Sequence, residues 1–352
     1  MKPINTLIRS NIASLLPYSC ARDEYESSLG IFLDANENSF GSPAGKGLNR
    51  YPDPLQKELK TAIGNLKSIN PKNIFLGNGS DEAIDLILRI FCEPNRDKVI
   101  VCPPTYGMYE VYAKINNIET IAIPLIAETF QLNITKIIEA ITPYTKAIFI
   151  CSPNNPTGNI IEQKDIFEIL NHFNGIVVID EAYIDFASVE SITPLVNSFP
   201  NLIVLQTLSK AWGMASLRVG LAIANEEIIN YFNKVKPPYN ISGLTQKAAI
   251  AALQNSQKTT KMVARILKER TNLKKALLTI PCVEKIYPSD ANFLLVKFTD
   301  ANRTYKYLID NLIIARNRSN VLLCDNCIRI TIGTPDENSE LIDCLQNQNL
   351  QE

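Results

Sequence analysis

Short, continuously apolar runs alternate along the chain with segments in which apolar residues recur every three or four positions. The apolar runs lie at residues 74–76, 99–101, 147–150, 176–179 and 202–205, and helical periodicity marks residues 56–66 and 82–91. A strand that is apolar throughout is buried on both faces, as in a parallel sheet between two layers of helices. The pattern therefore predicts an α/β fold with a mostly parallel, helix-covered sheet.

The pattern changes after about residue 240. Residues 243–278 contain few helix breakers and read as long helices, and strand-like runs follow at 292–298 and 328–332 with a helical piece between them. This change predicts a second, smaller α/β unit at the C-terminus.

The composition is that of a globular protein with almost no net charge. The 352 residues include 35 basic and 36 acidic side chains, for a formal charge of −1, and 46% are hydrophobic. Near-neutral charge leaves no electrostatic footprint for nucleic acid or an anionic membrane. Polar residues interrupt the N-terminal apolar positions, so no signal peptide is expected, and no stretch reaches the ~18 apolar residues of a membrane span. We therefore expect a cytoplasmic protein that binds neither nucleic acid nor membrane.

Cysteine and histidine usage narrows the chemistry. Eight cysteines in 352 residues are sparse for a disulfide scaffold, and the pair Cys324 and Cys327 lacks the second pair of a zinc site. The single histidine, His172, lies near the end of a predicted helix over 164–173, where the helix dipole favours it. Because the chain has only this one histidine, metal sites built from several histidines are excluded. We expect no metal site, and chemistry based on lysine, carboxylate, tyrosine or a cofactor.

Two turns rich in glycine or proline follow predicted strands. Residues 77–82 turn the chain into a helix that starts near Ser80, and such a helix N-terminus either holds a phosphate or is simply capped by the serine. Residues 151–158 form an Asn-Pro turn, in which Asn155 either binds a ligand oxygen or is an ordinary turn residue.

Two further strand ends carry charged residues. Asp180 follows the run at 176–179, where a carboxylate is poorly solvated and needs a cationic partner, and Tyr183 comes three residues later. Lys210 lies in the turn after the run at 202–205. A lysine in such a place is a phosphate ligand, a Schiff-base former or a solvated loop residue.

The order of these features resembles that of the fold-type-I, class-II pyridoxal-phosphate aminotransferases. The resemblance covers nearly the whole chain and includes residues 33–38, 50–54, 104–106, 236–240, 291–293 and 328–334. It implies a large domain with a mostly parallel seven-stranded sheet covered by helices, and a smaller α/β C-terminal domain. The implied division is an N-terminal arm and part of the small domain in 1–44, the large cofactor-binding domain in 45–242, and a long helix with the small domain in 243–352.

The resemblance also implies pyridoxal 5'-phosphate as the cofactor. Lys210 would form the Schiff base with it and act as the catalytic base, and Asp180 would pair with the pyridinium nitrogen. The other cofactor residues would be Tyr183 and Asn155 at the phenolic oxygen, Tyr106 on the ring face, and Ser80, Asp81, Ser209 and Arg218 at the phosphate. Tyr51 would reach the cofactor phosphate of the neighbouring subunit, so we expect a homodimer with shared active sites.

Substrate residues follow from the same resemblance. Arg329 alternates with two isoleucines on a predicted strand and so faces away from the apolar side. It would bind the amino donor's carboxylate, and with Arg316 it would hold a substrate phosphate. Tyr18, Asn36 and Glu37 match positions that close over the substrate. The implied substrates are L-glutamate and imidazole-acetol phosphate, in histidine biosynthesis.

Alternative functions stay open at this point. Aromatic-amino-acid aminotransferases and threonine-phosphate decarboxylases look similar and share most cofactor residues. A pyridoxal-phosphate-sensing regulator attached to a DNA-binding module is a third hypothesis, which the charge of −1 disfavours. Pro335 stands where many relatives carry arginine, and Ala215-Ser216 where Ala-Gly is common. These departures leave the breadth of substrates, including aromatic amino acids, undecided.

Overall fold

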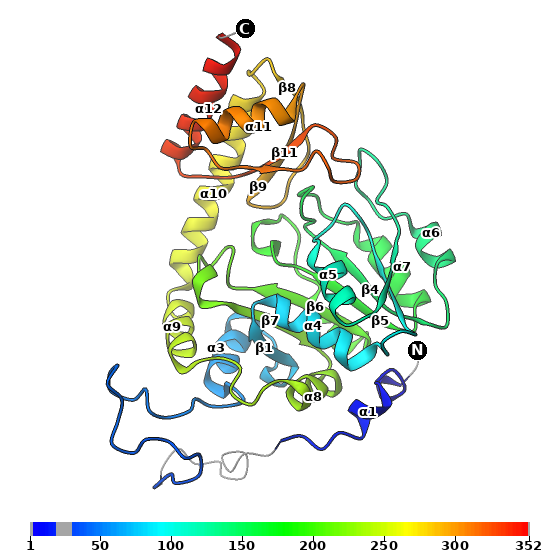
Figure 1. The fold of residues 1–352 in the computed structure, drawn as a ribbon, viewed down its shortest axis with the longest axis vertical. Helices are drawn as coiled ribbons and strands as arrows, with labels where there is room; N and C mark the ends of the chain where they lie inside the picture. The colour runs from blue at the N-terminus through cyan, green and yellow to red at the C-terminus, as the bar shows by residue number, and fades with distance from the viewer. Residues whose placement is uncertain (1–2, 19–29, 351–352) are drawn as a thin grey trace.

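Two sheets organise the chain. The computed structural model describes residues 3–18 and 30–350, with side chains described through residue 348. A seven-stranded sheet has the order β1-β7-β6-β5-β4-β2-β3, and a four-stranded sheet has the order β10-β11-β9-β8. In Figure 1 the large sheet lies in the lower part of the molecule and the small sheet at the top, joined by the long helix α10 (Ser256–Leu277).

The large sheet is mostly parallel. Its strands are β1 (Ile74–Asn78), β2 (Lys98–Val101), β3 (Glu119–Ala122), β4 (Thr145–Cys151), β5 (Ile176–Asp180), β6 (Leu202–Thr207) and β7 (Val219–Ala224). The strands β2 to β6 pair in parallel, whereas β7 is antiparallel to both β6 and β1. The C-terminal ends of β1, β4, β5 and β6 therefore share one edge of the sheet with the start of β7.

Helices bury both faces of this sheet. Along β4, Ala147 and Phe149 belong to one apolar cluster while Ile148 and Ile150 belong to the other, as the two-residue period of a strand requires. The first cluster includes side chains of α4 (Ser80–Phe91), α5 (Met108–Ile115) and α8 (Glu226–Val235). The second includes side chains of α3 (Lys57–Lys67), α6 (Ile134–Glu139), α7 (Gln163–His172) and α9 (Gly243–Leu253).

The small sheet is antiparallel and covered by helices on one face. It consists of β8 (Val283–Ile286), β9 (Phe293–Phe298), β10 (Arg316–Asn317) and β11 (Cys327–Thr331). Leu294, Val296, Ile328 and Ile330 pack in one cluster with side chains of α10, α11 (Ala301–Asp310) and α12 (Pro335–Leu350). The opposite face, which carries Arg329, looks toward the large sheet.

Short elements complete the chain. They are α1 (Ser10–Ala13) and the 3₁₀ helices η1 (Ile4–Thr6), η2 (Pro71–Asn73), η3 (Ile184–Phe186), η4 (Thr193–Asn197) and η5 (Ala215–Leu217). Ile4, Leu7, Ile8 and Ile12 pack in the same cluster as α4 and α8. No helix in the described ranges is long and apolar enough to cross a membrane.

The predicted fold class is confirmed. Each predicted apolar run became a strand of the large sheet, and the expected helix over 164–173 is α7. Four strands were not anticipated: β3, β7, β8 and the two-residue β10. β3 and β8 mix polar with apolar residues and are not fully buried. β7 is fully buried, but Gly220 near its start obscured its strand pattern. The three-part division at residues 44 and 242 stays a prediction.

Candidate active site

The predicted functional residues meet at one edge of the large sheet. β4, β5 and β6 are neighbours in the sheet, and Asn155, Asp180 and Lys210 lie at or just beyond their C-terminal ends. Open α/β sheets bind their ligands at this edge. The N-terminus of α4 and Arg218, which directly precedes β7, lie at the same edge.

A cavity of about 850 Å³ lies over this edge, between the two sheets. Its lining contains most of the predicted site residues, which are Ser80, Asp81, Tyr106, Asn155, Asp180, Tyr183, Ser209, Lys210, Arg218, Arg316 and Arg329. Sequence reasoning therefore located residues that the fold brings together, although they span about 250 positions of the chain.

Asp180 is a buried carboxylate with two hydrogen-bond donors. The whole residue is 3% exposed. The Tyr109 hydroxyl donates to its Oδ2 at 2.7 Å, and the backbone N–H of Ala182 donates to its Oδ1 at 3.0 Å. Burial raises the pKa of Asp180 to about 6, while these hydrogen bonds hold it lower than burial alone would. The site thus holds a carboxylate suited to a cationic partner.

Tyr109, which the sequence analysis did not select, lines the cavity beside Asp180. It is fully buried, and its ring stacks on Phe149 with ring centres 5.1 Å apart. Tyr106, three residues earlier, lies before α5 begins at Met108, so helical periodicity did not connect the two tyrosines. The two rings pack edge to face at 5.5 Å.

Lys210 lies in the turn after β6 and lines the cavity. Its Nζ lies 5.5 Å from the centre of the Tyr183 ring. Desolvation by the cavity walls lowers the pKa of Lys210, and the positive charge of Arg329 lowers it further, while Asp180 opposes both. A lysine with a lowered pKa supplies more of the neutral amine, which is the nucleophilic and basic form.

The N-terminus of α4 forms a cradle with Arg218. Gly79 precedes the helix with φ of 76°, and a Cβ atom there would lie 2.5 Å from Nη2 of Arg218. Gly220 on β7 faces the same point, where a Cβ would lie 2.0 Å from the backbone nitrogen of Ser80. Asp81 accepts hydrogen bonds from Arg218 at 3.4 Å and from Tyr106 at 2.9 Å. Helix N–H groups and a guanidinium at one point favour an anion.

The turn after β4 holds Asn155 between the two sheets. Arg329 Nη1 donates to Asn155 Oδ1 at 2.5 Å, and Asn155 Nδ2 donates to the Tyr183 hydroxyl at 3.5 Å. The neighbouring Asn154, which the sequence analysis did not select, fixes this turn. Its buried amide donates to the carbonyl oxygen of Pro104 at 2.8 Å and to the Thr157 hydroxyl at 2.7 Å.

Four predicted residues lie away from the cavity of their own chain. Tyr18 is 75% exposed, and Asn36 is also exposed. Glu37 pairs with Arg50 at 2.6 Å, and Tyr51 stacks on Tyr239 with ring centres 4.5 Å apart. The lining of the cavity, as far as the chain is described, includes none of the four. Their binding roles stay predictions.

The pair Cys324 and Cys327 and the single histidine lie outside the cavity lining that the structure describes. The described ranges contain no group of three or more histidine, cysteine, aspartate or glutamate side chains able to hold a metal. Burial raises the pKa of both Cys324 and Cys327 to about 12, so neither is a reactive thiolate. The Nδ1 atom of His172, at the end of α7, lies 2.8 Å from the carbonyl oxygen of Glu168, which is a structural contact.

Comparison with known proteins identifies the family. The family model for aminotransferase class I and II matches residues 31–345, and the chain belongs to this family. A histidinol-phosphate aminotransferase of Cytophaga hutchinsonii is 52% identical over 343 residues, which cover 97% of this chain and 98% of that protein. One of Parabacteroides distasonis is 50% identical over 350 residues, covering 99% and 100%.

The solved structures agree on the fold. The histidinol-phosphate aminotransferase from Clostridium acetobutylicum superposes with a TM-score of 0.80 at 25% identity, covering 87% of this chain and 92% of that one. The expected family is thereby confirmed, and with it a pyridoxal-phosphate-dependent aminotransferase.

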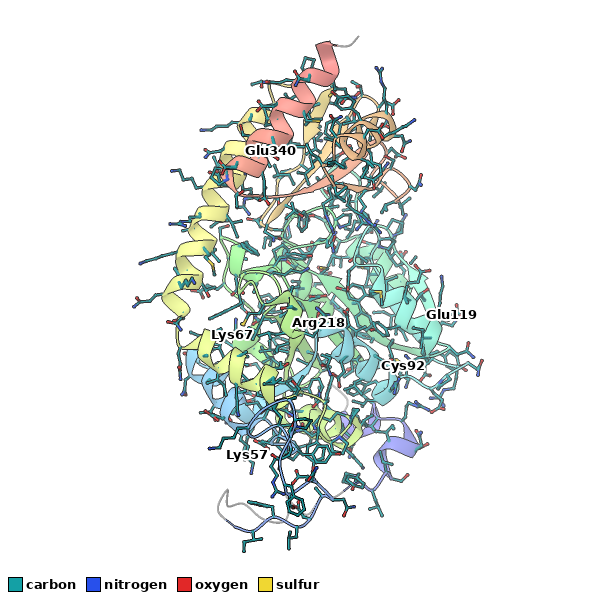
Figure 2. The ribbon with its side chains drawn as sticks, turned by 60° about the vertical axis from the view of Figure 1, so that its left-hand side comes forward. Lys57, Lys67, Cys92, Glu119, Arg218 and Glu340 are labelled. Atoms are coloured by element: carbon teal, nitrogen blue, oxygen red, sulfur yellow. The ribbon has the colours of Figure 1, made fainter. Side chains whose placement is uncertain are left out.

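The residues at the sheet edge fit pyridoxal phosphate. The α4 cradle suits its phosphate, and the buried Asp180, which has no ion pair in the described part of the chain, suits a protonated pyridine nitrogen. Lys210, with its lowered pKa, suits the aldehyde. Arg218, labelled in Figure 2 in the large-sheet part of the molecule, supplies the cationic side chain of the cradle.

Proposed function

We propose that the protein transfers an amino group reversibly between L-glutamate and imidazole-acetol phosphate, giving L-histidinol phosphate and 2-oxoglutarate in L-histidine biosynthesis. The carrying observation is the juxtaposition of Lys210 and Asp180, at the edge of the large sheet, with arginines of the small sheet across one cavity. The names of relatives about half identical over nearly the whole chain support the substrate assignment.

Lys210 is the residue that moves the proton. Pyridoxal phosphate, when bound, supplies an electron sink for the bond between Cα and its hydrogen. The lowered pKa of Lys210 leaves more of its amine neutral at pH 7, so Nζ can accept the Cα proton of the amino donor and return it in the reverse direction. Lys210 and Ser209 would hold the cofactor from β6, and Ser80, Asp81 and Arg218 would hold its phosphate.

Asp180 and its neighbours orient the cofactor ring. The ionised Asp180 would hold a proton on the ring nitrogen by charge, because burial strengthens the interaction between the two opposite charges. Tyr183 and Asn155 would donate to the ring's phenolic oxygen, and Tyr106 would cover the ring. The hydrogen bond of Asn155 to Arg329 would link this pair to the substrate side of the cavity.

Arg329 and Arg316 would bind the substrate anion. They are directly opposed on β11 and β10, so both project from the same face of the small sheet. A planar guanidinium binds a carboxylate or a phosphate through paired hydrogen bonds. Arg329 would therefore hold the carboxylate of glutamate in one half-reaction, and Arg329 with Arg316 would hold the phosphate of histidinol phosphate in the other.

The working unit would be a homodimer. Tyr51 is 50% exposed and lies outside the cavity lining of its own chain, which fits a tyrosine that completes the partner's site. Tyr18, Asn36 and Glu37 would close over substrate from the same N-terminal segment. Mixing a Tyr51→Ala chain with a Lys210→Ala chain should restore activity by forming one intact site per dimer. Two inactive chains that stay inactive on mixing would contradict shared sites.

The compartment would be the cytoplasm. The buried thiols of Cys92, Cys102 and Cys151 are all free, as in proteins of reducing compartments. Fractionation of source cells should recover the protein and its activity with the soluble cytoplasmic fraction.

The function is tested with a substrate panel. Purified enzyme with glutamate as donor should prefer imidazole-acetol phosphate to phenylpyruvate, and Lys210→Ala should abolish the complete cycle. A clear preference for phenylpyruvate would replace the substrate assignment by an aromatic one. Release of carbon dioxide from threonine phosphate without amino transfer would instead identify a decarboxylase.

A further inference from the structure

The cavity side of the small sheet carries a third arginine, Arg318. Arg316 and Arg329 are opposed in register, and the pairing continues one step further because the backbone N–H of Arg318 donates to the carbonyl of Cys327 at 2.8 Å. Residues two apart on a strand share a face, so Arg318 lies beside Arg316. All three arginines line the cavity.

The residue between Arg316 and Arg318 in the sequence confirms this orientation. Asn317 points to the other side of the sheet, where its Nδ2 donates to Oδ1 of Asn302 on α11 at 2.8 Å. Its partner in the register, Ile328, packs in the cluster beneath the helices. The alternation therefore turns Arg316 and Arg318 toward the large sheet.

No carboxylate of the described chain neutralises this group. The carboxylates that line the cavity already have partners: Asp81 pairs with Arg218 at 3.4 Å, Glu110 with Lys114 at 2.8 Å, and Asp180 accepts from Tyr109 at 2.7 Å. None of the three arginines forms an ion pair in the part of the chain that is described. Three guanidinium groups thus share one wall without a counter-charge.

Desolvation makes this arrangement unfavourable without a ligand. The Nε atoms of Arg318 and Arg329 are buried and have no hydrogen-bond partner. Burial lowers the pKa of Arg318, and the charges of Arg329 and Arg316 lower it further. Buried cations and buried N–H groups are stable when an anion with several acceptor oxygens joins them.

The number of arginines indicates which anion this is. A carboxylate has one charge and two oxygens, which a single guanidinium fork satisfies. A phosphate ester carries close to two charges at pH 7 and three terminal oxygens, so it can engage three cations. We propose that Arg318 binds the phosphate of the phosphorylated substrate and sets the preference for that substrate over its unphosphorylated analogue. This inference rests on the proposed function.

The test compares three amino donors on the holoenzyme. Rates of the half-reaction would be measured with L-histidinol phosphate, L-histidinol and L-glutamate for wild type, Arg318→Gln and Arg318→Lys. Loss of one charge-assisted contact should raise the KM for L-histidinol phosphate about 10- to 100-fold. KM for L-histidinol and for glutamate should change less than about threefold, and Arg318→Lys should recover part of the loss. Arg303→Gln, at an exposed arginine of α11, is the matched control.

A second measurement separates this inference from the proposed function. Inorganic phosphate should inhibit the wild-type half-reaction with glutamate competitively, and Arg318→Gln should weaken that inhibition by a similar factor. Equal losses with all three donors, or unchanged phosphate inhibition, would overturn the role of Arg318. A wild-type enzyme that does not use L-histidinol phosphate would overturn the proposed function, and phosphate inhibition would still report on Arg318.

Discussion

The hydroxyl group of Tyr109 donates a hydrogen bond of 2.7 Å to Oδ2 of Asp180, and both side chains are buried. The bond joins the helix α5 to the end of β5 and gives the buried carboxylate a fixed orientation. Burial raises the pKa of Asp180, and the hydrogen bond from Tyr109 opposes that rise. We therefore infer that Tyr109 is a positioning residue, which would act on the cofactor through Asp180.

Replacing Tyr109 by phenylalanine should weaken this support. The pKa of Asp180 should rise, so a smaller fraction is ionised near neutral pH, and kcat should fall about tenfold, as expected for one lost charge-assisted hydrogen bond. The acid limb of the pH–kcat profile should shift to higher pH, and part of the activity should return at high pH. Tyr112→Phe, one turn further along α5, should leave both quantities unchanged. A uniform loss at every pH would contradict an effect through Asp180.

The charge on Asp180 is expected to lower the stability of the folded protein while it serves the function. Its pKa in the folded protein, about 6, lies above the ordinary value. The folded state therefore binds the proton of Asp180 more tightly than the unfolded state does. The stability that protonation provides is complete below about pH 4 and is lost as pH rises through about 6. Asp180→Asn should make the cofactor-free protein more stable at pH 8 by up to about 2 kcal/mol, with little gain at pH 4.

Urea unfolding of cofactor-free wild type and Asp180→Asn at both pH values measures this difference. Asparagine keeps an oxygen that can accept from Tyr109, which limits secondary losses. Activity should fall more than about 100-fold, because no charge remains to hold the protonated ring nitrogen. A variant less stable than wild type at pH 8 would show that Asp180 is not a strained ionised group.

Gly220 should be intolerant of any side chain. A Cβ atom there would lie 2.0 Å from the backbone nitrogen of Ser80, so Gly220→Ala must displace the start of α4 and deform the phosphate cradle. We expect at least a 10-fold loss of affinity for pyridoxal phosphate and a destabilisation of about 2 kcal/mol or more. Gly107→Ala, where no atom lies within 4 Å of the added Cβ, is the matched control. Unchanged cofactor titration in Gly220→Ala would refute this close approach.

The strand ends could be predicted from sequence because their signals are local. Asp180 follows an apolar run directly, and the Asn155 and Lys210 turns carry proline, glycine or hydroxyl residues beside such runs. Tyr109 and Arg318 gave no comparable signal. Tyr109 lies 71 residues before its partner Asp180, so their contact exists only after the fold brings α5 to the end of β5.

Arg318 was missed for a different reason. The strand β10 is two residues long, too short for a periodic pattern, and the register that places Arg318 beside Arg316 comes from pairing with β11. Spacing of two from Arg316 was the signal available, once a strand is assumed there. The resemblance supplied Tyr51 but could not place it, since its expected contact would belong to the cavity of a neighbouring subunit.

A buried lysine pair outside the cavity allows a last prediction. Lys60 on α3 is 7% exposed and lies near Lys236, whose Nζ donates to the carbonyls of Pro54 at 2.8 Å and Pro238 at 2.7 Å. Burial lowers the pKa of Lys60 to about 8, and the charge of Lys236 contributes. The unfolded chain therefore binds the proton of Lys60 more tightly than the folded protein does. The charge on Lys60 lowers the stability of the folded protein below about pH 8, and this cost fades as pH rises toward about 10.5.

Lys60→Met should accordingly stabilise the protein at pH 7 by about 1 to 3 kcal/mol, with the gain shrinking as pH rises to 10. Urea midpoints at several pH values, at equal protein concentration, measure the change. Lys57→Met is the control, because Lys57, labelled in Figure 2, is exposed on the same helix and its charge remains solvated. A gain that is equal at pH 7 and pH 10 would assign the effect to packing of the methionine, since a penalty from the lysine charge must shrink once Lys60 loses its proton in the folded protein.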